Sequence, residues 1–374
     1  MKTNSLYSRV FGVVALLLSW SGAAQAEDAL AVDMFRHVVA QEKGNVVFSP
    51  ASAEAVLLML RDGAAGQTRR ELDALPYGKQ GVPSAMQVES ANALFAAEDL
   101  TLKPLGVKDI RRVPFSAAPA KAADAVNAWC SEKTHGRISS IVSPSAILPD
   151  TRLIAINAVY LKEKWVRPFE SHNTHPRTFT AADGRELQPP TMVQKASFKY
   201  AEGEDWQAVA LPYRPQQKGE QGYFIGIRPR GDARAFVEKM DANRLKAIRS
   251  ALNAANAEPT VVELPRFRIE TPIFNLNAAL QALGIQTAFT GDADFSGFSK
   301  EPLLLSEVRQ KCMVQVDEDG TEAAAVTAAI MMRYAMPRPQ PEPHIIRFDK
   351  PFLWVIADLS TAAPPYFMGL LENP

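Results

Sequence analysis

The sequence predicts a single large domain of the α+β class, because segments of strand character and of helix character are scattered along the chain in no repeating order. The strand candidates are short runs rich in β-branched and aromatic residues, and the helix candidates repeat their apolar residues at helical spacing. No internal repeat and no long linker divides the 374 residues. A chain of that length is long for one hydrophobic core and short for three, so we expect one domain.

The first predicted elements alternate between helix and strand. Apolar residues recur at helical spacing over 29–43, which predicts a helix. A short strand over 46–48 ends at a Ser-Pro break, where Ser49 or a neighbouring serine can cap a helix over 53–61. A further helix over 122–136 stops at a glycine.

Strand candidates dominate the rest of the chain. Residues 153–161 are β-branched and aromatic and predict a buried strand. Similar runs occupy 207–211, 222–227, 260–264, 311–316 and 353–356. A short helix over 279–284 again ends in glycine. The alternating prolines of 337–343 favour an extended surface segment.

The N-terminus has the layout of a secretory signal peptide. Lys2 and Arg9 precede a short apolar run, and small residues lead up to Ala26. The apolar run is too short to cross a bilayer. We therefore expect cleavage after residues 1–26 and a mature domain over 27–374, exported by a bacterium to the periplasm or the cell exterior.

The overall charge excludes several classes of partner. Lys and Arg together number 41, as do Asp and Glu, so the formal net charge is zero. Proteins that bind nucleic acids or membrane surfaces usually carry a basic excess. We expect neither kind of partner, and we expect a monomer.

The residues that commonly carry chemistry form no convincing catalytic or metal-binding pattern. An exported chain can join Cys130 to Cys312, but the sequence cannot place them within reach, and we favour two buried or half-buried thiols. His172 and His175 have no third ligand nearby, so zinc is a weak hypothesis. No G-x-S-x-G motif occurs, and the five histidines sit in no recognised catalytic motif. We expect no metal, no cofactor and no enzymatic activity.

One stretch near the C-terminus, DEDGTEAAAVTAAIMMRYAMP over 317–337, fits neither a core element nor a polar loop. Ala and Met favour a helix, but that helix would lack a stripe of large apolar residues. Read with the period of a strand, one face carries no charge, and the only charge between 321 and 332, Glu322, lies on the other face. The uncharged face is Thr321, Ala323, Ala325, Thr327, Ala329 and Met331. Such a strip could enter between two existing strands, with Asp319-Gly320 as a pivot.

Together with segments elsewhere in the chain, this stretch resembles the serpin family. The hinge of that family, at the base of its reactive-centre loop, resembles EDGTEAAAVT at 318–327. The family's shutter segment resembles NVVFSPASA at 45–53, and its C-terminal strands resemble FDKPFLW and YFMGLLENP. Further matches are Asn127, Trp129, Thr134, Gly136, Asn157, Ala158, Tyr160, Trp165, Phe169, Thr174 and Phe179, then LPRF, LGI and ADFSGF. Each motif alone is weak, but all of them in family order across the mature chain are specific.

The chain departs from the family pattern in three places. Residues 100–113 are shortened where the family usually carries a helix, and the Pro-rich stretch after the reactive bond is long. Gln310 occupies the shutter position that often holds a histidine. Gln can still donate and accept hydrogen bonds there.

The resemblance implies the serpin fold, with a large central β-sheet, two further sheets, surrounding helices and an exposed reactive-centre loop over about 318–343. It assigns the hinge to Glu318, Gly320, Thr321, Glu322, Ala323, Ala324, Ala325 and Thr327. It assigns the shutter, a polar cluster that controls opening of the sheet, to Ser49, Ser52, Asn157 and Gln310. It assigns the breach to Trp165 and Arg266, and Arg266 can pair with Glu318.

The resemblance also implies the activity. Serpins are single-use inhibitors: a serine or cysteine protease cleaves the loop, the hinge inserts into the sheet as a new strand, and the trapped acyl-enzyme is distorted. Catalytic residues belong to the target. The family spacing from Glu318 places the reactive bond at Tyr334–Ala335, which suits a chymotrypsin-like endopeptidase. A slip by one residue gives Arg333 and a trypsin-like target, and a slip by two gives Met332 and an elastase-like target.

A non-inhibitory serpin, acting as a carrier, a chaperone or a plain protease substrate, is the alternative. The hinge discriminates between the two, because Pro or a charge on its inserting face would block insertion. The small uncharged residues on that face favour the inhibitor.

Overall fold

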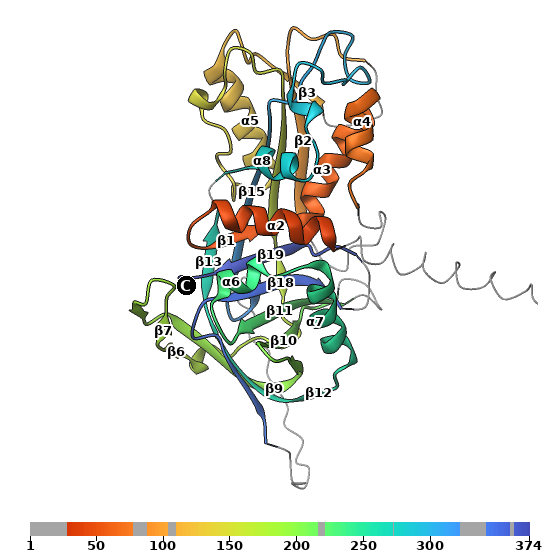
Figure 1. Ribbon diagram of the computed structural model, residues 1–374. Helices are drawn as coiled ribbons and strands as arrows, with labels where there is room; N and C mark the ends of the chain where they lie inside the picture. Colours follow the sequence, from red (N-terminus) through yellow and green to blue (C-terminus); the bar gives the residue numbers. More distant parts are fainter. Residues whose placement is uncertain are drawn as a thin grey trace, which may run out of the picture.

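The computed structural model describes residues 28–77, 88–103, 110–215, 221–271, 273–321, 342–359 and 363–374. These residues form an α+β structure in which three sheets are surrounded by helices. An eight-stranded sheet with α3, α4 and α5 beside it occupies the upper part of Figure 1, and a nine-stranded sheet with α6 and α7 occupies the lower part. The fold class predicted from the sequence is therefore confirmed.

The described residues contain seven α-helices. They are α2 (Ala29–Gln41), α3 (Pro50–Gly63), α4 (Gly66–Asp73), α5 (Pro119–Lys133), α6 (Ala233–Glu238), α7 (Ala242–Ala254) and α8 (Asn277–Ala282). Of these, α2, α3, α5 and α8 were predicted, and α4, α6 and α7 were not. The last two carried a local signal, since Asp232 and Asp241 each accept a hydrogen bond from a backbone N–H of the first turn.

Ser49 does not cap α3 in the way that the sequence suggested. It occupies the residue before the helix, and Pro50 takes the first helical position. Its hydroxyl instead donates to the carbonyl oxygen of Tyr366 at 2.7 Å, so Ser49 joins the helix start to the C-terminal strands.

The nine-stranded sheet gathers strands from both ends of the chain. Its order is β1 (Val46–Phe48), β19 (Phe367–Leu371), β18 (Phe352–Asp358), β11 (Gly222–Pro229), β10 (Trp206–Pro212), β9 (Pro190–Glu202), β12 (Ala257–Pro265) and β17 (His344–Arg347), with β6 (Thr174–Pro176) also paired to β9. The strand β17 lies at an edge, parallel to β12, and follows the loop region directly. A separate hairpin pairs β7 (Phe179–Thr180) with β8 (Glu186–Leu187).

The eight-stranded sheet contains the strands next to the hinge. Its order is β3 (Ile110–Val113), β2 (Val88–Ala97), β4 (Leu153–Leu161), β15 (Glu307–Val316), β16 (Gly320–Thr321) and β5 (Glu163–Lys164), with β13 (Phe267–Glu270) and β14 (Phe274–Asn275) also paired to β15. The strands β4 and β15 run parallel and pair directly from Glu307↔Ile154 to Met313↔Tyr160. We call this parallel junction of β4 and β15 the seam, and its pairing is slightly weaker per residue than antiparallel pairing.

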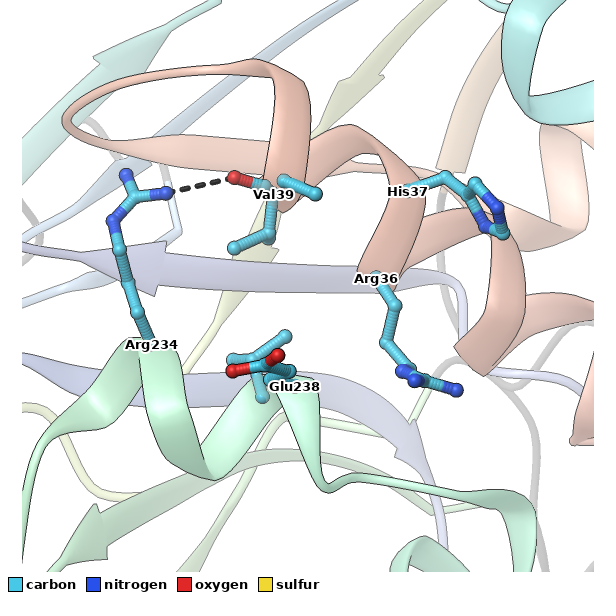
Figure 2. Close-up of a pocket in the computed structure, with 7 residues that line it drawn as sticks. Arg36, His37, Val39, Arg234 and Glu238 are labelled. Carbon is cyan, nitrogen blue, oxygen red and sulfur yellow. Dashed lines mark hydrogen bonds between the residues drawn. The ribbon is translucent and has the colours of Figure 1, made fainter.

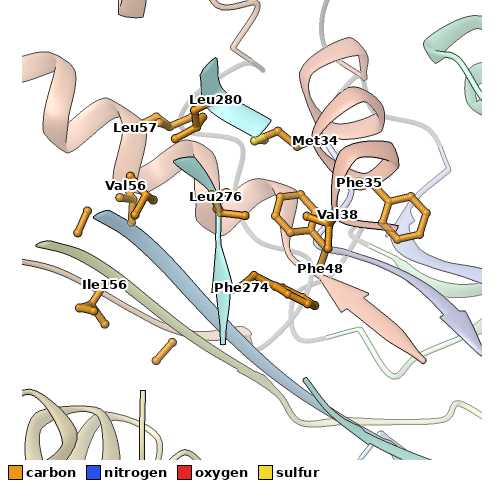
Figure 3. Packing of buried hydrophobic residues seen from close by; sticks show 14 of the residues in the cluster. Met34, Phe35, Val38, Phe48, Val56, Leu57, Ile156, Phe274, Leu276 and Leu280 are labelled. Atoms are coloured by element: carbon orange, nitrogen blue, oxygen red, sulfur yellow. The ribbon is translucent and has the colours of Figure 1, made fainter. Parts of the chain in front are cut away.

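Two hydrophobic clusters lie on opposite faces of the nine-stranded sheet, where alternate residues of β18 belong to the first and to the second. The first, seen in Figure 3, packs Phe35 of α2 and Val56 of α3 with Ile156 of β4. The second lies between the two large sheets and includes Val159 of β4 and Val314 of β15. Every residue of β4 is buried, and the strand reaches both clusters, with Ala158 in the first and Val159 in the second.

The cysteines remain free thiols. Both Cys130 and Cys312 are buried and neither forms a disulfide, which confirms the favoured interpretation. Burial raises the pKa of the Cys130 thiol to about 12, and it also raises the pKa of Cys312, so both thiols stay protonated at neutral pH.

Candidate functional site: hinge, breach and shutter

The start of the hinge is already a strand. Gly320 and Thr321 form β16, which lies between the end of β15 and the short strand β5 and is antiparallel to both. Thr321 pairs with Val316 on one side and with Glu163 on the other. Its side chain is fully buried. We call this slot, which holds Thr321 between Val316 and Glu163, the hinge seat.

Tyr213 closes the hinge seat from the second hydrophobic cluster. Its hydroxyl lies 2.6 Å from the hydroxyl of Thr321, and either oxygen can donate. Its ring stacks on Trp165 with 4.6 Å between ring centroids and 7° between planes. Burial raises the pKa of the Tyr213 hydroxyl, so the group is neutral at any ordinary pH.

Trp165 also holds the turn that leads into the hinge seat. Its indole Nε1 donates to the carbonyl oxygen of Asp317 at 2.9 Å, and its backbone N–H donates to the carbonyl of Asp319 at 3.0 Å. The backbone N–H of Phe169 donates to the carbonyl of Glu318 at 2.8 Å. Three consecutive hinge carbonyls are therefore satisfied by one neighbouring segment, which fixes the approach of the chain.

Arg266 and Thr174 hold the Glu318 side chain. The Arg266 guanidinium donates through Nε at 2.7 and 2.8 Å and through Nη2 to the same carboxylate, and the Thr174 hydroxyl adds a bond of 2.5 Å. Burial would raise the pKa of Glu318, but these hydrogen bonds outweigh it and leave the pKa below its ordinary value. The pair that the resemblance implied is thus formed, with Glu318 mostly buried and Arg266 partly exposed.

Gly320 is the one position in the hinge where glycine is required by geometry. Its φ is 156°, and a Cβ atom there would meet the carbonyl oxygen of Glu163 at 2.0 Å. That oxygen is backbone and cannot swing aside, so a side chain would force the strands apart.

The predicted shutter residues lie in a buried network of polar side chains at the seam. Gln310 of β15 donates to the Ser49 carbonyl at 3.0 Å and to Asn157 Oδ1 at 2.5 Å, and it accepts from the Ser49 backbone N–H at 3.0 Å. Asn157 of β4 donates in turn to the hydroxyl of Ser52. The structure therefore brings the four predicted shutter residues into one network across β4, β15 and the start of α3.

Ser90 and Asn92 of β2 extend this network, and sequence reasoning missed them. Ser52 and Ser90 share a hydroxyl contact of 2.5 Å, and Asn92 accepts from both Ser52 and Asn157. Tyr213 and the partner role of Thr174 were missed as well. Their neighbours in space lie far away in sequence, and no local pattern distinguishes them from ordinary strand residues.

The remaining predicted site residues lie outside the described residues. These are the hinge residues Glu322, Ala323, Ala324, Ala325 and Thr327, the candidate reactive residues Met332, Arg333, Tyr334 and Ala335, and the predicted signal peptide 1–26.

Other candidate sites lie apart from the hinge. Among the described residues, no group of three His, Cys, Asp or Glu side chains could hold a metal, and no helix is long and apolar enough to span a membrane. A cavity of about 410 Å³ lies between α2 and α6, with Arg36 and Glu238 on its walls (Figure 2). Arg234, which also lines this cavity, donates a hydrogen bond to the Val39 carbonyl at 2.7 Å and forms an ion pair with the Glu372 carboxylate.

Comparison with known proteins agrees with this geometry. The family described as serpin (serine protease inhibitor) matches residues 25–374. The chain belongs to the serpin family, whose members typically act on proteases as inhibitors and not as enzymes.

Similar proteins span nearly the same length. An uncharacterised serpin-like protein of Thermococcus kodakarensis is 34% identical over 93% of this chain and 85% of its own. Serpin B6 of Macaca fascicularis is 31% identical over 94% of this chain and 99% of its own. The structure resembles that of native protease nexin-1 with heparin, with a TM-score of 0.80 and 27% identity over 94% of this chain and 99% of that one.

Proposed function

We propose that this serpin is an inhibitor of the suicide type, which traps a serine endopeptidase as an acyl-enzyme by inserting its cleaved loop between β4 and β15. The observation that carries the proposal is the hinge seat. Thr321 already pairs with β15 on one side and β5 on the other, at the point where β4 and β15 separate. The direction and the entry point of a new strand are therefore set before cleavage.

The register of β16 supports a continued strand. Because β16 is antiparallel to both β15 and β5, each residue after Thr321 in a continued strand would pair with the residue one earlier in each of these two neighbouring segments. Continued in this register, Thr327 comes opposite Gln310 when counted from Val316, and opposite Asn157 when counted from Glu163. The directly observed pairing of Gln310 with Asn157 agrees with both counts. An inserted strand would thus place a hydroxyl between the two amides of the shutter.

The same register accounts for the small residues of the hinge. In an inserted strand Ala323 would come opposite Val314, and Ala325 opposite Cys312, and both of these partners belong to the second hydrophobic cluster. Small uncharged side chains on that face can enter a packed interior without a steric or desolvation penalty. Glu322, on the other face, would come opposite the exposed Lys162.

The energetics favour the inserted form. Insertion replaces one parallel seam by two antiparallel ones and adds a complete set of backbone hydrogen bonds. The uncleaved protein is then a kinetically trapped state whose stored free energy is released only when the loop is cut.

We further propose a chymotrypsin-like target, Tyr334–Ala335 as the reactive bond, and a site of action outside the cytoplasm. The family spacing from Glu318 supports the bond, and the apolar segment before Ala26 supports export. The neighbouring Arg333 and Met332 remain the alternatives for trypsin-like and elastase-like targets.

The test is to incubate the protein starting at Glu27 with chymotrypsin, trypsin and elastase separately. Denaturing gels and mass spectrometry of the released peptide are then compared. We expect a covalent band at the summed mass with chymotrypsin and a peptide that begins at Ala335. Tyr334→Arg should transfer trapping to trypsin, while Ala182→Arg, at an exposed position after β7, should leave the protease preference unchanged.

Complete cleavage without a covalent band, for all three proteases, would contradict inhibition by these classes and would support a carrier, chaperone or substrate role.

A further inference from the structure

The hinge seat raises a question that the trapping mechanism leaves open, namely what keeps Thr321 in the sheet before cleavage. The pairing of β16 is short, with one residue pair to β15 and two to β5. A two-residue strand has few backbone hydrogen bonds to hold it, so side-chain contacts must contribute to its position.

The Tyr213 hydroxyl is the side-chain group that meets Thr321. It lies 2.6 Å from the Thr321 hydroxyl, in a site where both side chains are excluded from water. The Tyr213 ring cannot easily move away, because it stacks on Trp165 and because Tyr213 and Trp165 also form an isolated backbone bridge. A buried hydroxyl left without a partner is unfavourable, so the two hydroxyls stabilise each other's position.

We propose that Tyr213 is a positioning residue, which retains Thr321 in the hinge seat and so determines how the cleaved loop divides between insertion and release of the protease. This inference rests on the proposed trapping function. After cleavage, insertion competes with hydrolysis of the acyl-enzyme. With Thr321 seated, the next step is only the separation of Met313 from Tyr160 at the adjacent end of the seam. If Thr321 leaves the hinge seat, the loop must first bring it back between Val316 and Glu163, and the entropic cost of that step slows insertion.

The two hydroxyls can be removed independently with almost no change in shape. Tyr213→Phe retains the ring that stacks on Trp165, and Thr321→Val replaces the Thr321 hydroxyl by a methyl group on the same branched side chain. Thr321→Ser restores a hydroxyl. Tyr223→Phe is the matched control, since Tyr223 lies on the neighbouring strand β11 but packs against the first hydrophobic cluster on the opposite side.

The measurement is the number of inhibitor molecules consumed per chymotrypsin molecule trapped, with the covalent band quantified on gels. We expect Tyr213→Phe and Thr321→Val each to raise the ratio of released cleaved inhibitor to trapped complex, which is that number minus one, about fivefold, as the loss of one hydrogen bond would. The double variant should be no worse than either single variant, because the same contact is removed. Thr321→Ser and Tyr223→Phe should behave as the unaltered protein does.

Three results would overturn the inference. They are an unchanged ratio for Tyr213→Phe, effects that multiply in the double variant, and a Thr321→Ser variant as impaired as Thr321→Val. If Tyr213→Phe fails to fold, the Thr321→Val and Thr321→Ser pair still decides the role of the hydroxyl contact. These results differ from a failure of the proposed function, in which the unaltered protein itself would form no covalent complex.

Discussion

Thr321→Arg is the substitution that the hinge seat makes most informative. Thr321 is fully buried between β15 and β5, and its hydroxyl partner Tyr213 is buried with it. An arginine would leave the Tyr213 hydroxyl without its partner, at a cost of about 1–3 kcal/mol. Its guanidinium would also lose water in the second hydrophobic cluster, which costs several kcal/mol for an unpaired ion.

A total of about 5 kcal/mol would exclude the arginine from the hinge seat. Since each 1.4 kcal/mol is a factor of ten, a barrier higher by about 5 kcal/mol slows insertion by between three and four orders of magnitude. Hydrolysis of the acyl-enzyme would then win, and the inhibitor would become a substrate. The reactive bond itself is unchanged, so cleavage by chymotrypsin should continue.

The assay compares intact inhibitor, cleaved inhibitor and covalent complex on denaturing gels after mixing with chymotrypsin. We expect cleaved product to replace the covalent band for Thr321→Arg. Ala182→Arg adds the same charge at an exposed position after β7 and should trap normally. A Thr321→Arg variant that forms the covalent complex at full yield would refute the reasoning.

Three further substitutions test the other parts of the site. Gly320→Ala places a Cβ atom 2.0 Å from the Glu163 carbonyl oxygen, so we expect cleavage without trapping, and full trapping would be inconsistent with the close approach. Arg266→Ala leaves the buried Glu318 carboxylate without its cation and should lower the free energy of unfolding by about 1–2 kcal/mol at pH 7. The folded pKa of Glu318 is depressed, so the stability that its ionised form provides is present above its ordinary pKa near 4.5 and is lost as pH falls. In urea titrations, the difference in unfolding free energy between the unaltered protein and Arg266→Ala should therefore become smaller below that pH. A difference that stays constant with pH would argue against a role for Glu318 ionisation. Gln310→Ala removes the centre of the shutter network and should lower the free energy of unfolding by about 2–3 kcal/mol. The thermal midpoint in calorimetry should fall with it, and an unchanged midpoint would show that the network is not stabilising.

Local sequence signals were sufficient where an element buries one continuous face. The strand over 153–161 was predicted at the bounds that β4 has, because each of its residues is apolar or fits a buried sheet. The strand β9 and the helix α7 were missed. The exposed side chains of β9 interrupt the apolar alternation that identifies a strand. The helix α7 begins at an Asp cap, which apolar periodicity alone does not detect.

The hinge composition and the shutter residues are also predictable from the amino-acid sequence. Ser49, Asn157 and Gln310 were identified through the family resemblance, and the fold brings them into hydrogen-bond contact. The contribution of Tyr213 could not be predicted. It follows a strand of the other large sheet, 108 residues before Thr321, and no pattern in the chain joins the two.

By itself, the sequence determined the α+β class, the serpin resemblance and a strip of small residues able to enter a sheet, because these properties depend on residue type and spacing along the chain. Only the tertiary structure decided which neighbours the first residue of that strip meets. The position of Thr321 depends on β15, β5 and Tyr213, which are remote in sequence and meet only after the two large sheets have packed. Contacts of that kind are selected by packing, which local propensity does not encode.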